Sequence, residues 1–152
     1  MFEQYLEQIR AEAIAAFPQE AIWLITEAGC RQVANVHDNP LEFFACSEKD
    51  SRKAQAEGLL AVVHSHPNNV AAPSSGDMQG QLDTSVPWAI IAKDGVAAND
   101  IAWWGKGATK APLVGRTFRH GITDCYALIK DYYEIEMGID LPEFPRDWEW
   151  WK

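Results

Sequence analysis

The sequence predicts an α/β domain with a C-terminal helical extension, and three observations support this fold class. Helix-like and strand-like apolar patterns alternate over about the first 107 residues. A stretch rich in Gly, Pro and basic residues, "GKGATKAPLVGR" (residues 105–116), then interrupts the pattern. One further helical pattern follows, in a segment of about 36 residues that is too short to bury a core of its own.

The elements begin and end at residues that start or stop regular structure. Apolar side chains recur at three- and four-residue spacing in the first helix, which stops at Pro18. Ser47 can cap the second helix, and Gly58 can end it. Helices are predicted at residues 2–17, 48–58, 74–85 and 124–137. Strands are predicted at residues 21–29, 31–38, 41–47, 59–66, 86–93 and 100–107.

Composition and charge argue against several classes of partner and location. The formal net charge is -9 and the 13 Lys and Arg residues are scattered, so we do not expect binding to nucleic acid. No apolar run approaches the roughly 20 residues of a membrane span, and the N-terminus lacks the pattern of a secretory signal. Three cysteines without paired spacing argue against a disulfide framework. We therefore expect the chain to stay in the cytoplasm unless other machinery exports it.

The segment "HSHPNNVAAPSSGD" (residues 64–77) carries the main candidate site. His64 and His66 end a predicted strand, and side chains two apart on a strand project from the same face. Asp77 lies in the first turn of the next predicted helix, and a returning loop would make its carboxylate a third ligand. Three N and O ligands with a fourth position left to water are typical of a catalytic zinc site. A hydrogen-bonded polar loop is the alternative.

Amide hydrolysis at such a site also needs a base and a group that stabilises the oxyanion. Glu20, after the break at Pro18, is the best placed base by sequence order, with Glu27 and Glu42 as alternatives. Ser74 can donate a hydrogen bond to the oxyanion, or it can simply cap the helix.

The pattern H-x-H-x7-S-x-x-D, with a glutamate upstream in "FPQEAIWLI", resembles the JAMM motif of the Mov34/MPN/PAD-1 metallopeptidases. The resemblance covers residues 1–110 and implies a JAMM/MPN-like curved mixed β-sheet flanked by helices. The zinc ligands that it implies are His64, His66 and Asp77. It further implies Glu20 as the general acid/base, Ser74 as the oxyanion helper, Zn2+ as the cofactor, and cleavage of peptide or isopeptide bonds.

Cys125 is a second candidate catalytic residue. It falls in the first turn of a predicted helix, where free N–H groups and the helix dipole stabilise a thiolate. A small buried cysteine on the apolar face of that helix is the alternative reading. The stretch "GRTFRHGITDCYALIKDYY…GIDLPEFPRDWEWW" resembles the start of the NlpC-type, papain-like cysteine peptidase domain that follows a JAMM domain in lambda-like phage tail assembly proteins of the K type. The resemblance implies Cys125 as the nucleophile.

That second family also needs a histidine base well downstream of the cysteine, and this sequence contains none there. His120 lies upstream and does not match it. We therefore expect residues 111–152 to be a linker and a truncated N-terminal part of an NlpC-type domain. A cysteine without its base is a poor nucleophile, so we expect this part to be inactive.

Together the two resemblances imply a zinc metallopeptidase in a phage tail context. They imply phage tail proteins as partners, and a cell-wall (peptidoglycan) peptide or a tail precursor as substrate, between which the sequence does not choose. The implied location is the host bacterial cytoplasm during assembly or the virion tail. The main alternative is a non-catalytic assembly module with a vestigial or structural metal site.

Overall fold

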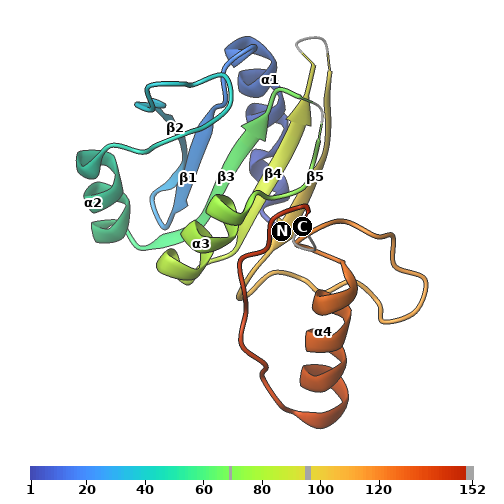
Figure 1. Ribbon diagram of the computed structural model, residues 1–152. Coiled ribbons are helices and arrows are strands. Elements are labelled where there is room, and N and C mark those ends of the chain that lie inside the picture. The colour runs from blue at the N-terminus through green and yellow to red at the C-terminus, as the bar shows by residue number, and fades with distance from the viewer. Residues whose placement is uncertain (69, 95–96, 150–152) are drawn as a thin grey trace.

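Five strands form one mixed sheet with helices on both of its faces (Figure 1). The computed structural model describes residues 1–68, 70–94 and 97–149. The strands are β1 (Ile22–Thr26), β2 (Gly29–Val33), β3 (Leu59–His66), β4 (Trp88–Lys93) and β5 (Ala98–Trp104). The helices are η1 (Glu3–Tyr5), α1 (Leu6–Ala16), α2 (Glu48–Ala56), α3 (Ser75–Thr84) and α4 (Cys125–Met137). This mixed sheet flanked by helices confirms the predicted fold class.

The strand order makes β3 the central strand of the sheet. The order is β2-β1-β3-β4-β5, in which β3 and β4 are parallel and all other neighbours are antiparallel. Parallel neighbours cannot be joined by a hairpin, so the chain crosses from β3 to β4 through α3. The crossover returns the first turn of α3 to the C-terminal end of β3, where the candidate ligands lie.

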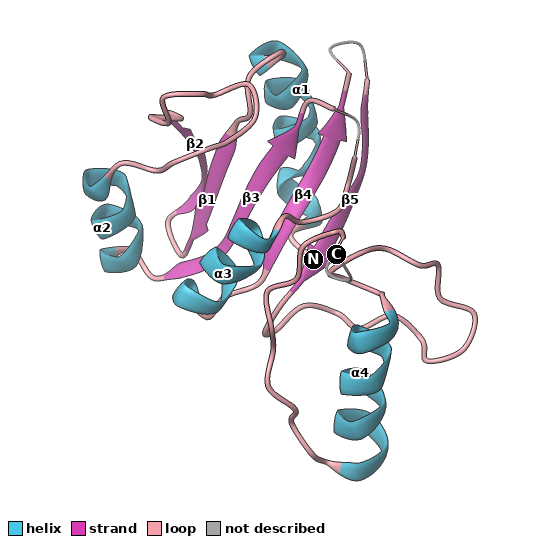
Figure 2. Cartoon of the chain, viewed as in Figure 1, coloured by secondary structure: helices cyan, strands magenta, loops and turns pink. Residues whose placement is uncertain are grey.

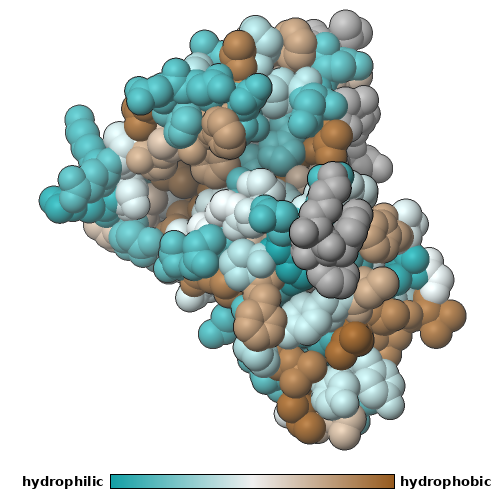
Figure 3. All heavy atoms as spheres, viewed as in Figure 1, coloured by the Kyte–Doolittle hydropathy of each residue, from teal (hydrophilic) through white to brown (hydrophobic). Residues whose placement is uncertain are grey.

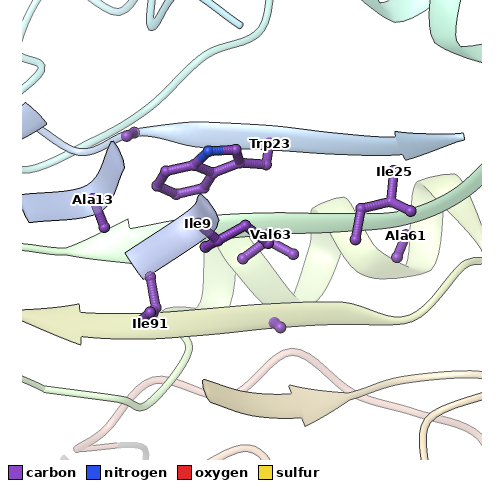
Figure 4. Close-up of a cluster of buried hydrophobic side chains, with 9 residues drawn as sticks. Ile9, Ala13, Trp23, Ile25, Ala61, Val63 and Ile91 are labelled. Atoms are coloured by element: carbon purple, nitrogen blue, oxygen red, sulfur yellow. The ribbon is translucent and has the colours of Figure 1, made fainter. Parts of the chain in front are cut away.

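Alternation of side chains along the strands builds one apolar core on each face of the sheet. On the first face, Ile9 and Ala13 of α1 pack against strand residues that include Trp23, Val63 and Ile91 (Figure 4). The cluster on the other face includes Ile22, Leu24, Val62 and Ile90, with Ala54 of α2 packed on it. The two histidines of β3 share the second face with Val62.

The strand predicted at residues 41–47 does not form, and that prediction is wrong. The amide of Asn35 donates to the Phe43 carbonyl oxygen (2.9 Å) and accepts from the Ala45 N–H (3.0 Å), so a side chain satisfies this backbone in place of a neighbouring strand. Leu41 and Phe43 are 51% and 53% exposed. Of the apolar side chains in this segment, Phe44 and Cys46 pack against the core. The segment therefore forms a loop.

The extension continues from the end of β5 and carries α4. Residues 105–124 form neither helix nor strand, as the long pink segment in Figure 2 shows. Asp124 caps α4 by accepting from the Ala127 N–H, and Gly138 ends the helix with a positive φ of 66°. In the described residues, no helix combines the length and apolarity that crossing a membrane requires.

Candidate metal centre

The end of β3 brings two imidazoles together in the interior. His64 is fully buried, and its ring centroid lies 4.5 Å from that of Phe44 and 6.0 Å from that of Trp88. His66, two residues further along the strand, projects to the same side. The Nε2 atoms of the two histidines lie 3.1 Å apart, so one ion can meet both.

Asp77 faces both histidines from the first turn of α3. Its Oδ1 lies 3.4 Å from His64 Nε2, and its Oδ2 lies 3.5 Å from His66 Nε2. A capping box fixes this position, because the Ser74 hydroxyl accepts from the Asp77 N–H (3.1 Å) while the Ser74 N–H donates to Asp77 Oδ2 (2.8 Å). The S-x-x-D spacing therefore both starts the helix and aims the carboxylate.

The three side chains fit a zinc ion by atom type and by spacing. One potential ligand atom from each lies within 4.8 Å of the others. His66 Nδ1 lies 2.8 Å from the Val70 carbonyl oxygen, a contact that places the proton on Nδ1 and leaves the Nε2 lone pair for a metal. A catalytic zinc site typically has three protein ligands of this kind, two nitrogens and one oxygen, and leaves the fourth coordination position to water.

Electrostatics favour the metal-binding protonation states of His64 and Asp77, whereas they favour the protonated form of His66, whose proton a bound metal would displace. Burial lowers the pKa of His64, so this imidazole is neutral at pH 7. Burial acts to raise the pKa of Asp77, but the two histidines and the Ser74 N–H outweigh it, and the pKa lies well below its usual range. Burial likewise opposes the charged form of His66, yet the hydrogen bond and charge of Asp77 raise its pKa. An ionised carboxylate beside a neutral imidazole is the form that ligates zinc.

Glu20 lies just before β1, and only 7% of its surface is exposed. Burial raises the pKa of its carboxyl group to about 7, and the negative charge of Asp77 acts in the same direction. The charges of His66 and Lys93 act in the opposite direction. The carboxyl group is thus electrostatically coupled to the candidate ligands and has the pKa of a general acid/base near neutral pH. The alternative bases, Glu27 and Glu42, are exposed.

Two residues that support this centre were not predicted from the sequence. All four hydrogen-bonding positions of the Asn35 amide are used, and one N–H donates to the Glu20 carbonyl oxygen (3.0 Å). Lys93 is fully buried, and its Nζ donates to the carbonyl oxygens of Ala13 (2.6 Å) and Gln19 (2.8 Å). An Asn inside a predicted strand and a Lys at the end of an apolar strand carry no distinctive sequence signal.

The other two predicted catalytic residues occupy different surroundings. Ser74 is exposed and caps α3, and because its hydroxyl oxygen accepts from Asp77, its own proton remains available to donate. Cys125 is an exposed free thiol at the start of α4, on the extension. The nearby His120 uses Nε2 in a hydrogen bond to the Arg146 carbonyl oxygen (3.0 Å).

Curated relatives include two phage proteins and one bacterial protein. Tail tip assembly protein K of Escherichia phage lambda is 34% identical over 107 residues, which are 70% of this chain and 49% of that protein. The protein of the same name from Escherichia phage N15 is 29% identical over 168 aligned residues, 100% of this chain and 63% of that protein. This chain therefore spans about half to two thirds of the length of these two relatives. A probable TtuB-protein conjugate cleaving protease of Thermus thermophilus is 36% identical over 105 residues, 61% of this chain and 69% of that protein.

Two solved structures also resemble the chain. A protein from Salinibacter ruber aligns with a TM-score of 0.46 and 23% identity, over 80% of this chain and 88% of that one. A protein from Desulfitobacterium hafniense aligns with a TM-score of 0.49 and 25% identity, over 59% and 71%. The family described as prokaryotic homologs of the JAB domain matches residues 2–106, which hold the whole sheet, the His-His-Asp cluster and Glu20. The chain belongs to this prokaryotic JAB-domain family.

Proposed function

We propose that residues 1–110 form a zinc-dependent metallopeptidase of JAMM type that hydrolyses a peptide or isopeptide bond. The observation that carries the proposal is one buried cluster, in which the side chains of His64, His66 and Asp77 converge and the nearby Glu20 has a pKa of about 7. Family membership and a relative named as a conjugate-cleaving protease support a peptidase-type hydrolase.

Each residue of the site has its own role in the proposed reaction. His64, His66 and Asp77 would hold the zinc, which when bound polarises a carbonyl group and lowers the pKa of water. Glu20 takes the proton from the attacking water and returns it to the leaving amine, as its raised pKa allows. The Ser74 hydroxyl donates to the oxygen of the carbonyl under attack as negative charge develops there.

A phage tail context is part of the proposal and rests on the two relatives named as tail tip assembly proteins. It makes phage tail proteins the partners, the host cytoplasm or the virion tail the location, and a cell-wall peptide or a tail precursor the substrate. In the same context we propose that residues 111–152 begin an NlpC-type cysteine peptidase domain, with Cys125 at the position of its nucleophile.

A second candidate function is a non-catalytic assembly module that keeps zinc as a structural ion. The names of the two phage relatives, which describe assembly, favour it. Hydrolysis distinguishes the two functions, because both predict bound zinc.

The test combines zinc content with hydrolysis of purified peptidoglycan and of purified tail precursor proteins. Wild-type protein should bind about one zinc per chain, and His64→Ala and Asp77→Asn should lose it; the second substitution keeps a capping oxygen on α3. His37→Ala and Asp83→Asn, on exposed or partly exposed positions outside the cluster, are the matched controls and should retain zinc. Unchanged zinc in both ligand variants overturns the ligand assignment. If the protein binds one zinc per chain but cleaves neither substrate, the peptidase function is wrong and the assembly module is favoured.

A further inference from the structure

A cleft of about 790 Å³ lies where the JAB-matched residues meet the extension. Val70, Ala71 and Ala92 line it from the matched part, whereas Phe118, Arg119 and Trp148 line it from the extension. Four of the ten described residues that line the cleft therefore lie outside the family match. The cleft is a composite feature of this chain.

The cleft adjoins the metal centre through two contacts of His66. The imidazole Nδ1 is hydrogen-bonded to the carbonyl oxygen of Val70, a wall residue (2.8 Å). Ala92, another wall residue, is the register partner of His66 in the β3–β4 pair. A ligand in the cleft would thus lie beside the loop that orients a metal ligand.

Several hydrogen bonds hold the extension against this loop and α3. Arg119 Nη1 donates to the Ala71 carbonyl oxygen (3.2 Å), and the Ser75 hydroxyl donates to Asp147 Oδ1 (2.5 Å). The Arg146 N–H contacts Met78 Sδ at 3.2 Å. Figure 1 shows the same arrangement, with the red C-terminal segment running beside α3. The wall that the extension supplies is therefore fixed in place.

The chemistry of the wall differs from that of the rest of the chain. The formal net charge of the chain is -9, yet the described residues that line the cleft include two arginines and no acidic residue. Four alanines also line the cleft, together with Phe118 and Trp148, each 59% exposed. A guanidinium group recognises a carboxylate, small side chains leave room for an extended backbone, and aromatic rings supply contact area.

We propose that this cleft binds the substrate polypeptide on one side of the scissile bond, through a segment that carries a carboxylate among small side chains, with Arg119 as the carboxylate-binding residue. The proposal rests on the proposed peptidase function and deepens it by naming the substrate class. Arg119 commits one N–H to Ala71, and a guanidinium group has five, so donors remain for a ligand.

Binding of two short peptides to the full chain tests the proposal by NMR titration. The probes are acetyl-Ala-Glu-Ala-amide and its uncharged counterpart acetyl-Ala-Gln-Ala-amide. The Glu peptide should bind about tenfold or more tightly than the Gln peptide, since a hydrogen-bonded charge pair carries most of the difference. Arg119→Gln should remove this preference, and Trp148→Ala should weaken both peptides. Arg52→Gln, which removes an exposed arginine of α2, is the matched control and should change neither.

The outcomes separate this proposal from the proposed function. Equal binding of the two peptides, no binding of either, or an unchanged preference in Arg119→Gln overturns the cleft assignment even where zinc and hydrolysis are normal. Peptide preference without hydrolysis of peptidoglycan or tail precursors confirms a carboxylate-binding cleft but overturns the peptidase, and with it the assignment of the bound segment as substrate. Muropeptides and acidic precursor-derived peptides, titrated side by side, identify which source supplies the carboxylate.

Discussion

The candidate metal centre and the start of α4 differ in how deeply their side chains are buried. His64, His66 and Asp77 are buried and contact one another, and Glu20 is buried beside them. Cys125 is exposed. The comparison teaches that a reactive side chain becomes a site through the groups that surround it, since burial and neighbouring charge set its pKa and orientation.

The helix that carries Cys125 also leaves its apolar side chains uncovered. Leu128, Ile129, Tyr132 and Ile135 recur at helical spacing and are 37% to 51% exposed. Figure 3 shows brown, hydrophobic side chains gathered over the lower part of the molecule that α4 forms. Apolar surface of this kind favours association with another surface. The contrast with the enclosed metal centre can be tested by single substitutions.

Glu20→Gln should have the largest effect on the reaction. Glutamine keeps the size of the side chain but cannot accept and return a proton, so hydrolysis should fall by about 10²- to 10⁴-fold. Zinc content should stay near that of the wild type, because the three ligands are untouched.

Initial rates of hydrolysis measured beside zinc content check this prediction. Glu42→Gln, which changes an exposed glutamate of the neighbouring loop, is the control and should retain full activity. A Glu20→Gln variant with wild-type rates would remove Glu20 from the mechanism and return the choice of base to Glu27 or Glu42.

Asn35→Ala should have the next largest effect and act mainly on the fold around Glu20. The substitution removes hydrogen bonds to Glu20, His37, Phe43 and Ala45, and we expect the free energy of unfolding to fall by about 1–3 kcal/mol. Urea unfolding measures it, with Asn39→Ala in the same loop as the control. Equal stability of the two variants would mean that the loop does not depend on Asn35.

Local sequence rules predicted the metal-binding segment but not the loop that Asn35 holds. The strand-end histidines and the capped helix follow from local rules, and the structure has β3 and the Ser74 cap where those rules place them. The loop at residues 41–47 follows no local rule. Its conformation depends on the Asn35 side chain and on a carbonyl oxygen of Pro40 that accepts from the Glu20 N–H. Such contacts join residues far apart in the chain and leave no periodic pattern.

The stability of the metal-free protein should depend on pH through Glu20. The folded-state pKa of about 7 lies above the ordinary value of 4.5, so between these values the folded state binds more protons than the unfolded state. The contribution of Glu20 is thus most favourable below pH 4.5 and declines as the pH rises to 7. Glu20→Gln should remove this decline.

Urea unfolding of the chelator-treated wild type and variant, from pH 4.5 to 8, checks the sign. The stability of Glu20→Gln relative to the wild type should rise with pH up to about 7 and then level off. A difference that is constant with pH would mean that folding does not raise the pKa of the Glu20 carboxyl group.

Cys125→Ser should have the smallest effect, and that result would complete the contrast between the two regions. The thiol is exposed, and Nε2 of His120, five residues before it in the sequence, bonds to the Arg146 carbonyl oxygen rather than to the thiol. A cysteine without a base beside it is a poor nucleophile. We expect unchanged zinc content, hydrolysis within about twofold of the wild type, and a stability change within about 0.5 kcal/mol. Cys46→Ser provides the comparison, because Cys46 packs on the second core cluster and its replacement should destabilise the protein more. A large loss of hydrolysis in Cys125→Ser would instead show that Cys125 takes part in the reaction although it is exposed.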